Sequence, residues 1–64
     1  MKIDYDKESD SLYLQLSERP GLDAEEIEPG IVFDFDRDGT VVGIDIEHAS
    51  RFVDVRTFEV PKAL

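Results

Sequence analysis

The sequence predicts a small, mainly β domain with a short α-helix, built as a four-stranded antiparallel meander of two hairpins. Apolar and polar residues alternate with period two in four short runs. Turn-forming residues separate the two runs of each pair. The chain has 64 residues, which is the size of one domain with a small core. We therefore expect a single β-rich domain over residues 1–64.

The clearest signal is a hairpin within residues 30–47, where two alternating runs flank the turn Arg37-Asp38-Gly39-Thr40. Asp38 and Gly39 tolerate positive φ, which the primed turns of tight hairpins require. The apolar residues of one face are Ile31, Phe33, Phe35, Val42, Ile44 and Ile46. Residues 2–17 predict another hairpin, with a polar turn at 7–10. Its apolar residues are Ile3, Tyr5, Leu12, Leu14 and Leu16.

The remaining segments carry weaker patterns. Residues 18–29 hold two prolines and five acidic residues, so we expect a connecting loop, with a short edge strand at 24–26 as the alternative. Residues 48–53 lack strand alternation and start with small and polar side chains, which favours a short helix. We expect residues 54–64 to form an irregular tail or an edge strand that covers the apolar face.

One apolar face across four strands must be covered by something. The tail offers six large apolar residues against eleven on the sheet, which is too few to cover it. The six are Phe52, Val53, Val55, Phe58, Val60 and Leu64. Self-association would supply the rest, so we expect a homodimer. Its expected interface residues are Phe33, Phe35, Ile44, Phe52 and Phe58.

Composition restricts the classes of partner. Sixteen acidic residues against seven basic ones give a formal charge of −9, which opposes binding to nucleic acid and to anionic membranes but permits a basic partner protein. The chain has no cysteine and one histidine, which disfavours a disulfide framework and a structural zinc site. No apolar leader or membrane-spanning run is present, and we expect a soluble, cytoplasmic protein.

The strongest motif for ligand chemistry is Asp34-x-Asp36-x-Asp38-Gly39, which matches the opening of an EF-hand calcium loop. Its twelfth position is Asp45 where such a loop has a glutamate, and both flanks alternate as strands. We therefore expect a plain Asp-Gly turn and keep Asp34, Asp36 and Asp38 as an alternative cation site. No other metal ligand or cofactor is expected.

No catalytic residue emerges from the pattern. Asp4, Asp6, Glu8 and Asp10 form an acidic cluster that we expect to face solvent. Without a pocket that desolvates one of these carboxylates, we expect no acid–base chemistry from them. His48 lacks a nucleophile at a known spacing and is interpreted as a surface residue. Its alternative role is a pH-sensitive contact with Asp45 or Glu47. We expect the protein not to be an enzyme.

Two segments resemble a known family, the small bacterial and archaeal proteins of domain-of-unknown-function family 2283. The first is Tyr5-Asp6 with Glu8, Asp10 and Leu12-Tyr13-Leu14. The second runs from Gly30-Ile31-Val32 through Asp34, Asp36, Gly39, Val41-Val42-Gly43-Ile44 and Ile46 to Ala49 and Ser50. The resemblance implies a small β-rich domain with no assigned catalytic or binding residues. Some members resemble the antitoxin-like partner of a small basic protein.

These observations lead to one functional hypothesis and one alternative. The hypothesis is a non-enzymatic protein–protein interaction module that forms a homodimer and can bind a basic partner protein. The alternative is a small-ligand or divalent-cation binding protein that uses the turn at Asp34, Asp36 and Asp38.

Overall fold

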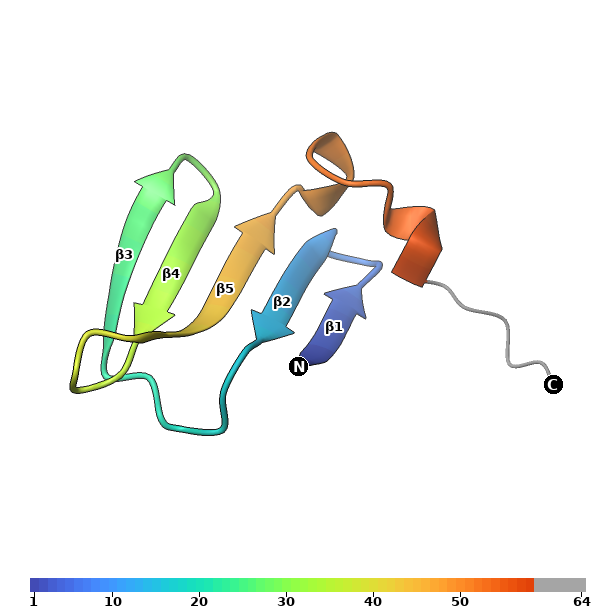
Figure 1. Cartoon of the computed structure of the whole chain (residues 1–64). Coiled ribbons are helices and arrows are strands. Elements are labelled where there is room, and N and C mark those ends of the chain that lie inside the picture. Colours follow the sequence, from blue (N-terminus) through green and yellow to red (C-terminus); the bar gives the residue numbers. More distant parts are fainter. Residues whose placement is uncertain (59–64) are drawn as a thin grey trace, which may run out of the picture.

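The structure is a computed structural model that describes residues 1–58, apart from the side chain of residue 58. These residues form one five-stranded antiparallel sheet followed by two 3₁₀ turns (Figure 1). The strands are β1 (Lys2–Asp6), β2 (Ser11–Gln15), β3 (Asp23–Glu28), β4 (Ile31–Phe35) and β5 (Val41–Glu47). The turns are η1 (Ala49–Arg51) and η2 (Val55–Phe58). The sheet thus has five strands where the sequence predicted four.

The prediction of a simple meander is also wrong. The strand order is β1-β2-β5-β4-β3, so the β1–β2 hairpin lies beside β5 and not beside the strand that follows it in the chain. The β2–β5 register pairs Leu12 with Ile46 and Leu14 with Ile44. Since paired residues share a face, this register joins the apolar residues of the two predicted hairpins into one surface.

Strand β3 replaces half of the loop expected at 18–29 and is longer than the alternative edge strand at 24–26. It pairs with β4 at the edge of the sheet, and all six of its residues are exposed. An edge strand that is exposed to solvent needs few apolar side chains. Its charged side chains protect it from pairing with strands of other chains. The pattern was missed because four of these six residues are acidic.

The turn between β4 and β5 forms at the predicted residues but is not of the primed type. Gly39 has φ +84, whereas Asp38 is not among the residues with positive φ. The Gly39 N–H donates to the Asp36 carbonyl at 3.0 Å, and the Asp36 N–H donates to the Thr40 carbonyl at 2.9 Å. This is a longer hairpin loop with a single left-handed glycine. It is followed by a register shift, so that Phe35 faces Val41 and not Val42.

The short α-helix predicted at 48–53 is absent, and only the single turn η1 forms there. His48 adopts a left-handed conformation with φ 54, which ends β5 and turns the chain back towards β1 and β2. Beyond it, η2 takes the place of the possible edge strand and contacts β1. The rest of the predicted tail lies outside the described residues. Within residues 1–58, no helix is long and apolar enough to cross a membrane.

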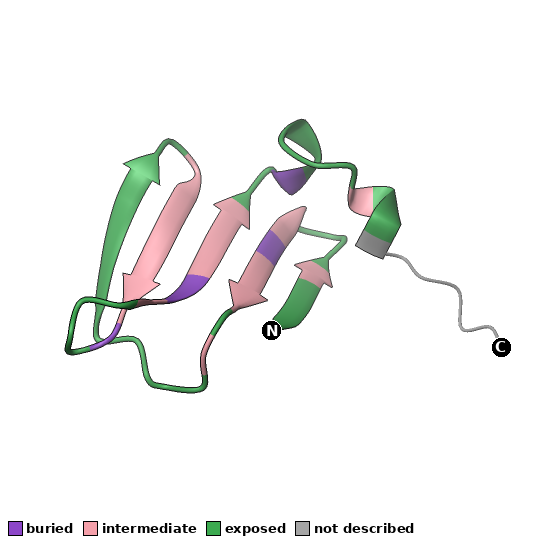
Figure 2. Ribbon diagram, in the orientation of Figure 1, coloured by how far each residue is buried: buried purple, intermediate pink, exposed green. Residues whose placement is uncertain are grey.

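The core is very small. Among the described residues, the buried apolar ones are Leu12, Val42 and Ala49, and most other apolar side chains of the sheet are half-buried (Figure 2). Phe52 and Val53 in the C-terminal segment remain 48% and 37% exposed. These two C-terminal side chains are therefore not fully packed against the sheet, which agrees with the expectation that the tail is too small to cover the apolar face by itself.

Replacing Leu12 with alanine tests where this core lies. Leu12 is 1% exposed, so we expect Leu12→Ala to lower the free energy of unfolding by about 2–5 kcal/mol. Leu22→Ala is the matched control, because Leu22 is 65% exposed and its loss should change stability by less than about 0.5 kcal/mol. Urea denaturation followed by circular dichroism measures both. Equal losses in the two variants would contradict the assigned core.

Candidate functional site

The apolar face of the sheet is organised in rows that run across the strands. The central row places Ile3, Leu14, Ile44 and Phe33 side by side on β1, β2, β5 and β4. The next row places Tyr5, Leu12, Ile46 and Ile31 on the same four strands. Phe33 and Phe35 make a tilted ring pair with centroids 6.3 Å apart. Four strands thus carry one continuous apolar surface.

This apolar surface ends at β3. Cross-strand register places Glu25 opposite Phe33, Glu28 opposite Ile31 and Asp23 opposite Phe35. Residues paired in this way lie on the same face of a sheet. Each apolar row therefore ends in a carboxylate at the β3 edge, and we call Asp23, Glu25 and Glu28 the acidic fence. The opposite edge, β1, contributes Ile3, which is 49% exposed.

The other face of the sheet is polar, and Tyr13 lies at its centre. Its ring crosses over Gly43, where an added Cβ would lie 2.6 Å from the Tyr13 Cζ atom and overlap the hydroxyl group. The hydroxyl group donates to Asp34 Oδ2 at 3.0 Å. Burial, followed by this hydrogen bond, raises the pKa of Tyr13 above its usual 10.0. The raised pKa means that neutral Tyr13 contributes to the stability of the fold below pH 10.0. This contribution is lost as the pH rises through the raised pKa of Tyr13.

Acidic side chains surround Tyr13 on this polar face. Burial raises the pKa of Asp45, and the charges of Glu47 and Asp34 raise it further. An open groove of about 380 Å³ lies beside Tyr13, and its lining residues are Tyr13, Gly21, Leu22, Asp23, Ala24 and Asp34. Another of about 310 Å³ is lined by Lys2, Ile3, Asp4, Tyr13 and Gln15. The polar face is therefore grooved and carries like charges that repel one another.

The aspartates of the calcium-like motif have separate roles in the structure. Asp36 is buried, and its Oδ1 accepts the N–H groups of Asp38 and Thr40 at 2.8 and 3.0 Å. Its Oδ2 lies 3.2 Å from Arg19 Nε, which makes an ion pair without hydrogen-bond geometry. Asp34 accepts from Tyr13, and Asp38 binds Arg19 at 2.9 Å. Across residues 1–58, no three acidic, histidine or cysteine side chains converge to hold a metal.

Asp10 ties the C-terminal segment to the first hairpin. Its carboxylate accepts the hydroxyl groups of Tyr5 and Ser50, each at 2.7 Å, and the Ser50 N–H at 3.1 Å. Its backbone carbonyl accepts the Ala49 N–H at 2.9 Å. We call Tyr5, Asp10, Ala49 and Ser50 the clasp. The bond from Tyr5, followed by that from Ser50, lowers the pKa of Asp10 below 3.8, so the clasp weakens as the pH falls through that lower value.

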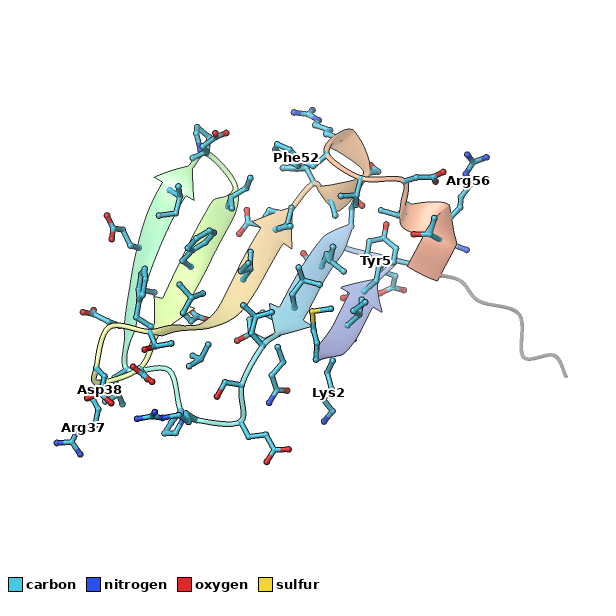
Figure 3. All side chains as sticks on the ribbon, in the orientation of Figure 1. Lys2, Tyr5, Arg37, Asp38, Phe52 and Arg56 are labelled. Atoms are coloured by element: carbon cyan, nitrogen blue, oxygen red, sulfur yellow. The ribbon has the colours of Figure 1, made fainter. Side chains whose placement is uncertain are left out.

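The other candidates from the sequence stay apart. Asp4, Asp6 and Glu8 are exposed, as expected for a solvated cluster, and Asp10 leaves the cluster to form the clasp. His48 is exposed, and its alternative role in a pH-sensitive contact with Asp45 or Glu47 stays a prediction. Phe33, Phe35 and Ile44 are half-buried on the apolar surface, and Phe52 projects at the end of β5 (Figure 3). The side chain of Phe58 lies outside the described residues.

Comparison with known proteins identifies the family of this chain. The model of a family described as a protein of unknown function, DUF2283, matches residues 2–50. The chain belongs to this family. The match ends at Ser50, the last residue of the clasp, so the DUF2283 unit includes both halves of this contact. The motifs that carried the resemblance thus meet in space, Tyr5 and Asp10 from one half and Ala49 and Ser50 from the other.

One relative of this chain is a longer protein. An uncharacterised protein of Methanocaldococcus jannaschii is 37% identical over 67 residues, which covers all of this chain and 54% of the relative. The chain thus spans about half the length of that relative. No solved structure matches the chain.

Substitution of Gly43 tests the polar face. In Gly43→Ala the new methyl group should displace the Tyr13 ring and break its hydrogen bond to Asp34, so the pKa of Tyr13 should fall towards 10.0. Titration of the tyrosine Cζ resonances by NMR measures this pKa. Gly39→Ala is the control: its φ of +84 makes the substitution costly to the turn, but nothing lies within 4 Å of the new methyl group, so the Tyr13 titration should not change. An unaltered titration in Gly43→Ala would contradict this geometry.

Proposed function

We propose that this chain is a non-enzymatic protein–protein interaction module that forms a homodimer through the apolar surface of its sheet. The observation that carries this proposal is the continuous apolar surface on β1, β2, β5 and β4, whose side chains, apart from the buried Leu12, are left partly exposed by the described residues. A sheet with one apolar face needs a second layer. A chain of 64 residues without cysteine has few other means of stabilisation, and oligomerisation is one of them.

The face of the sheet suits self-association better than its edges do. The β3 edge carries Asp23, Glu25, Glu26 and Glu28, so pairing between two β3 strands would bring eight carboxylates together. The β1 edge is in contact with η2. The apolar surface has no such obstacle, and burial of apolar area is the main favourable contribution to association.

A second copy is a more suitable occupant than an unrelated protein. If the sheet is stable only when its apolar face is covered, every copy of the chain needs a partner whenever it is present. A second copy of the same chain is always present in equal amount. Two copies carry a repulsive charge of −9 each. Many of these charges lie on the polar face or at β3, and physiological salt screens charges beyond about 8 Å. Hydrophobic burial should therefore exceed the repulsion.

Dilution and a charge-matched pair of variants test the homodimer. We expect light scattering to show a dimer that dissociates on hundredfold dilution and a melting temperature that rises with protein concentration. Ile3→Lys should shift the equilibrium to the monomer, because Ile3 lies on the apolar surface. Asp4→Asn changes the net charge by the same amount on the opposite face and should leave the dimer intact.

Ile3 is 49% exposed in the protomer, so the Ile3→Lys protomer should still fold when concentrated. A concentration-independent monomer of 7.3 kDa that melts cooperatively would overturn the proposal. Equal weakening of the dimer by Ile3→Lys and Asp4→Asn would also overturn it, since the apolar surface would then not be the interface.

The polar face supports the second half of the proposal, the binding of a basic partner protein. Burial raises the pKa of Asp45 there, and repulsion from the charges of Glu47 and Asp34 raises it further. A lysine or arginine side chain placed beside Asp45 would relieve this repulsion, and the Tyr13 ring offers a face for cation–π contact. The cation-binding alternative has less support, because Asp36 is already engaged by the turn and by Arg19.

A lysine-rich peptide serves as a probe for the polar face. At low salt, its addition should shift the amide resonances of Gly43 and Asp45 more than those of β3, and Asp45→Asn should reduce these shifts. Glu25→Gln is the charge-matched control, because Glu25 is exposed and lies on the other face of the sheet, and it should change them little. Shifts that concentrate on β3, or that are insensitive to Asp45→Asn, would contradict a binding role for the polar face.

A further inference from the structure

We infer that the two copies pack with their two-fold axis parallel to the strands and between β2 and β5, so that β1 of each copy covers β4 of the other. This inference rests on the proposed homodimer and specifies its arrangement. It follows from the acidic fence, which makes the two ends of each apolar row chemically different.

Packed antiparallel sheets keep their strands within about 30° of each other. A two-fold axis between two sheets packed in this way is either parallel or perpendicular to the strands. A perpendicular axis would place β3 over the partner's β3, with Asp23, Glu25 and Glu28 of both copies facing one another. Like charges facing each other across an interface oppose association. This arrangement therefore juxtaposes six carboxylates at one end of the dimer.

A parallel axis between β2 and β5 removes this conflict. The apolar surface spans four strands in the order β1-β2-β5-β4, so this axis lies at its centre. Rotation then places β1 over the partner's β4 and β2 over the partner's β5, and the central row brings Ile3 above the partner's Phe33. Each β3 projects past the partner's β1, so the two fences lie at opposite ends of the dimer and remain in solvent.

The two arrangements predict different distances. Strands lie about 4.8 Å apart and packed sheets about 10 Å apart. With the parallel axis, the two copies of Glu25 are separated by five strand spacings across the sheets, on the order of 24 Å. Ile3 and the partner's Glu25 are then separated by one strand spacing in the same direction. With the perpendicular axis, the two copies of Glu25 face each other, and Ile3 is about four spacings from the partner's Glu25.

Cross-linking of single-cysteine variants distinguishes these arrangements, because the natural chain has no cysteine. Ile3→Cys and Glu25→Cys replace exposed residues, so both variants should fold and dimerise. One variant carries a mass tag, and the two are mixed and treated with a short bismaleimide reagent. We expect the tagged Ile3→Cys to link to the untagged Glu25→Cys and Glu25→Cys alone to remain largely unlinked.

The reverse result, with Glu25→Cys linking to itself and no mixed product, would overturn the parallel axis while leaving the homodimer in place. Light scattering on the same samples separates this outcome from failure of the homodimer. A monomer with no cross-link in any mixture would overturn both proposals. A dimer in which neither pair links would place the interface elsewhere and would likewise contradict both.

Discussion

The antiparallel pairing of β2 with β5 is the contact on which the rest of the structure depends. It joins the β1–β2 hairpin to the β3–β4–β5 meander and aligns their apolar residues in common rows. It also brings Tyr13 over Gly43 and within 3.0 Å of Asp34 on the other face. Without this pairing the chain would form a two-stranded hairpin and a separate three-stranded meander. An isolated hairpin is at best marginally stable in water, and three strands are about the minimum for independent stability. Both surfaces of functional interest therefore arise from one strand pair.

The two faces of the sheet differ because the sequence alternates apolar and charged residues over the same strands. One face is apolar, and the other carries Asp45, whose pKa is raised by burial and further by the charges of Glu47 and Asp34. The two surfaces suit different kinds of partner, because one is apolar and the other is acidic. The proposed homodimer covers the apolar face and leaves the polar face, with its grooves beside Tyr13, open to a basic protein.

Period-two alternation was sufficient to find four of the five strands and the apolar residues that they share. It could not find β3, because an exposed edge strand of mostly acidic residues has no apolar periodicity. Nor could it give the strand order, since alternation shows which residues share a face and not which strands are neighbours. The Tyr13–Gly43 contact was missed for the same reason, although a glycine within a strand is a known sign of close approach by another group. The helix predicted at 48–53 failed because His48 takes a left-handed backbone conformation that composition does not reveal.

The strand order also has a consequence for the kinetics of folding. The β1–β2 hairpin and the β3–β4–β5 meander each pair neighbouring segments, so both can form by closing short loops. The β2–β5 pairing instead joins residues such as Leu14 and Ile44, and the whole meander must be ordered before this contact is complete. Contacts of this sequence separation slow folding, so we infer that the docking of hairpin onto meander is the late step. The clasp from Asp10 to Ser50 spans a still longer stretch of chain and would close only after that docking.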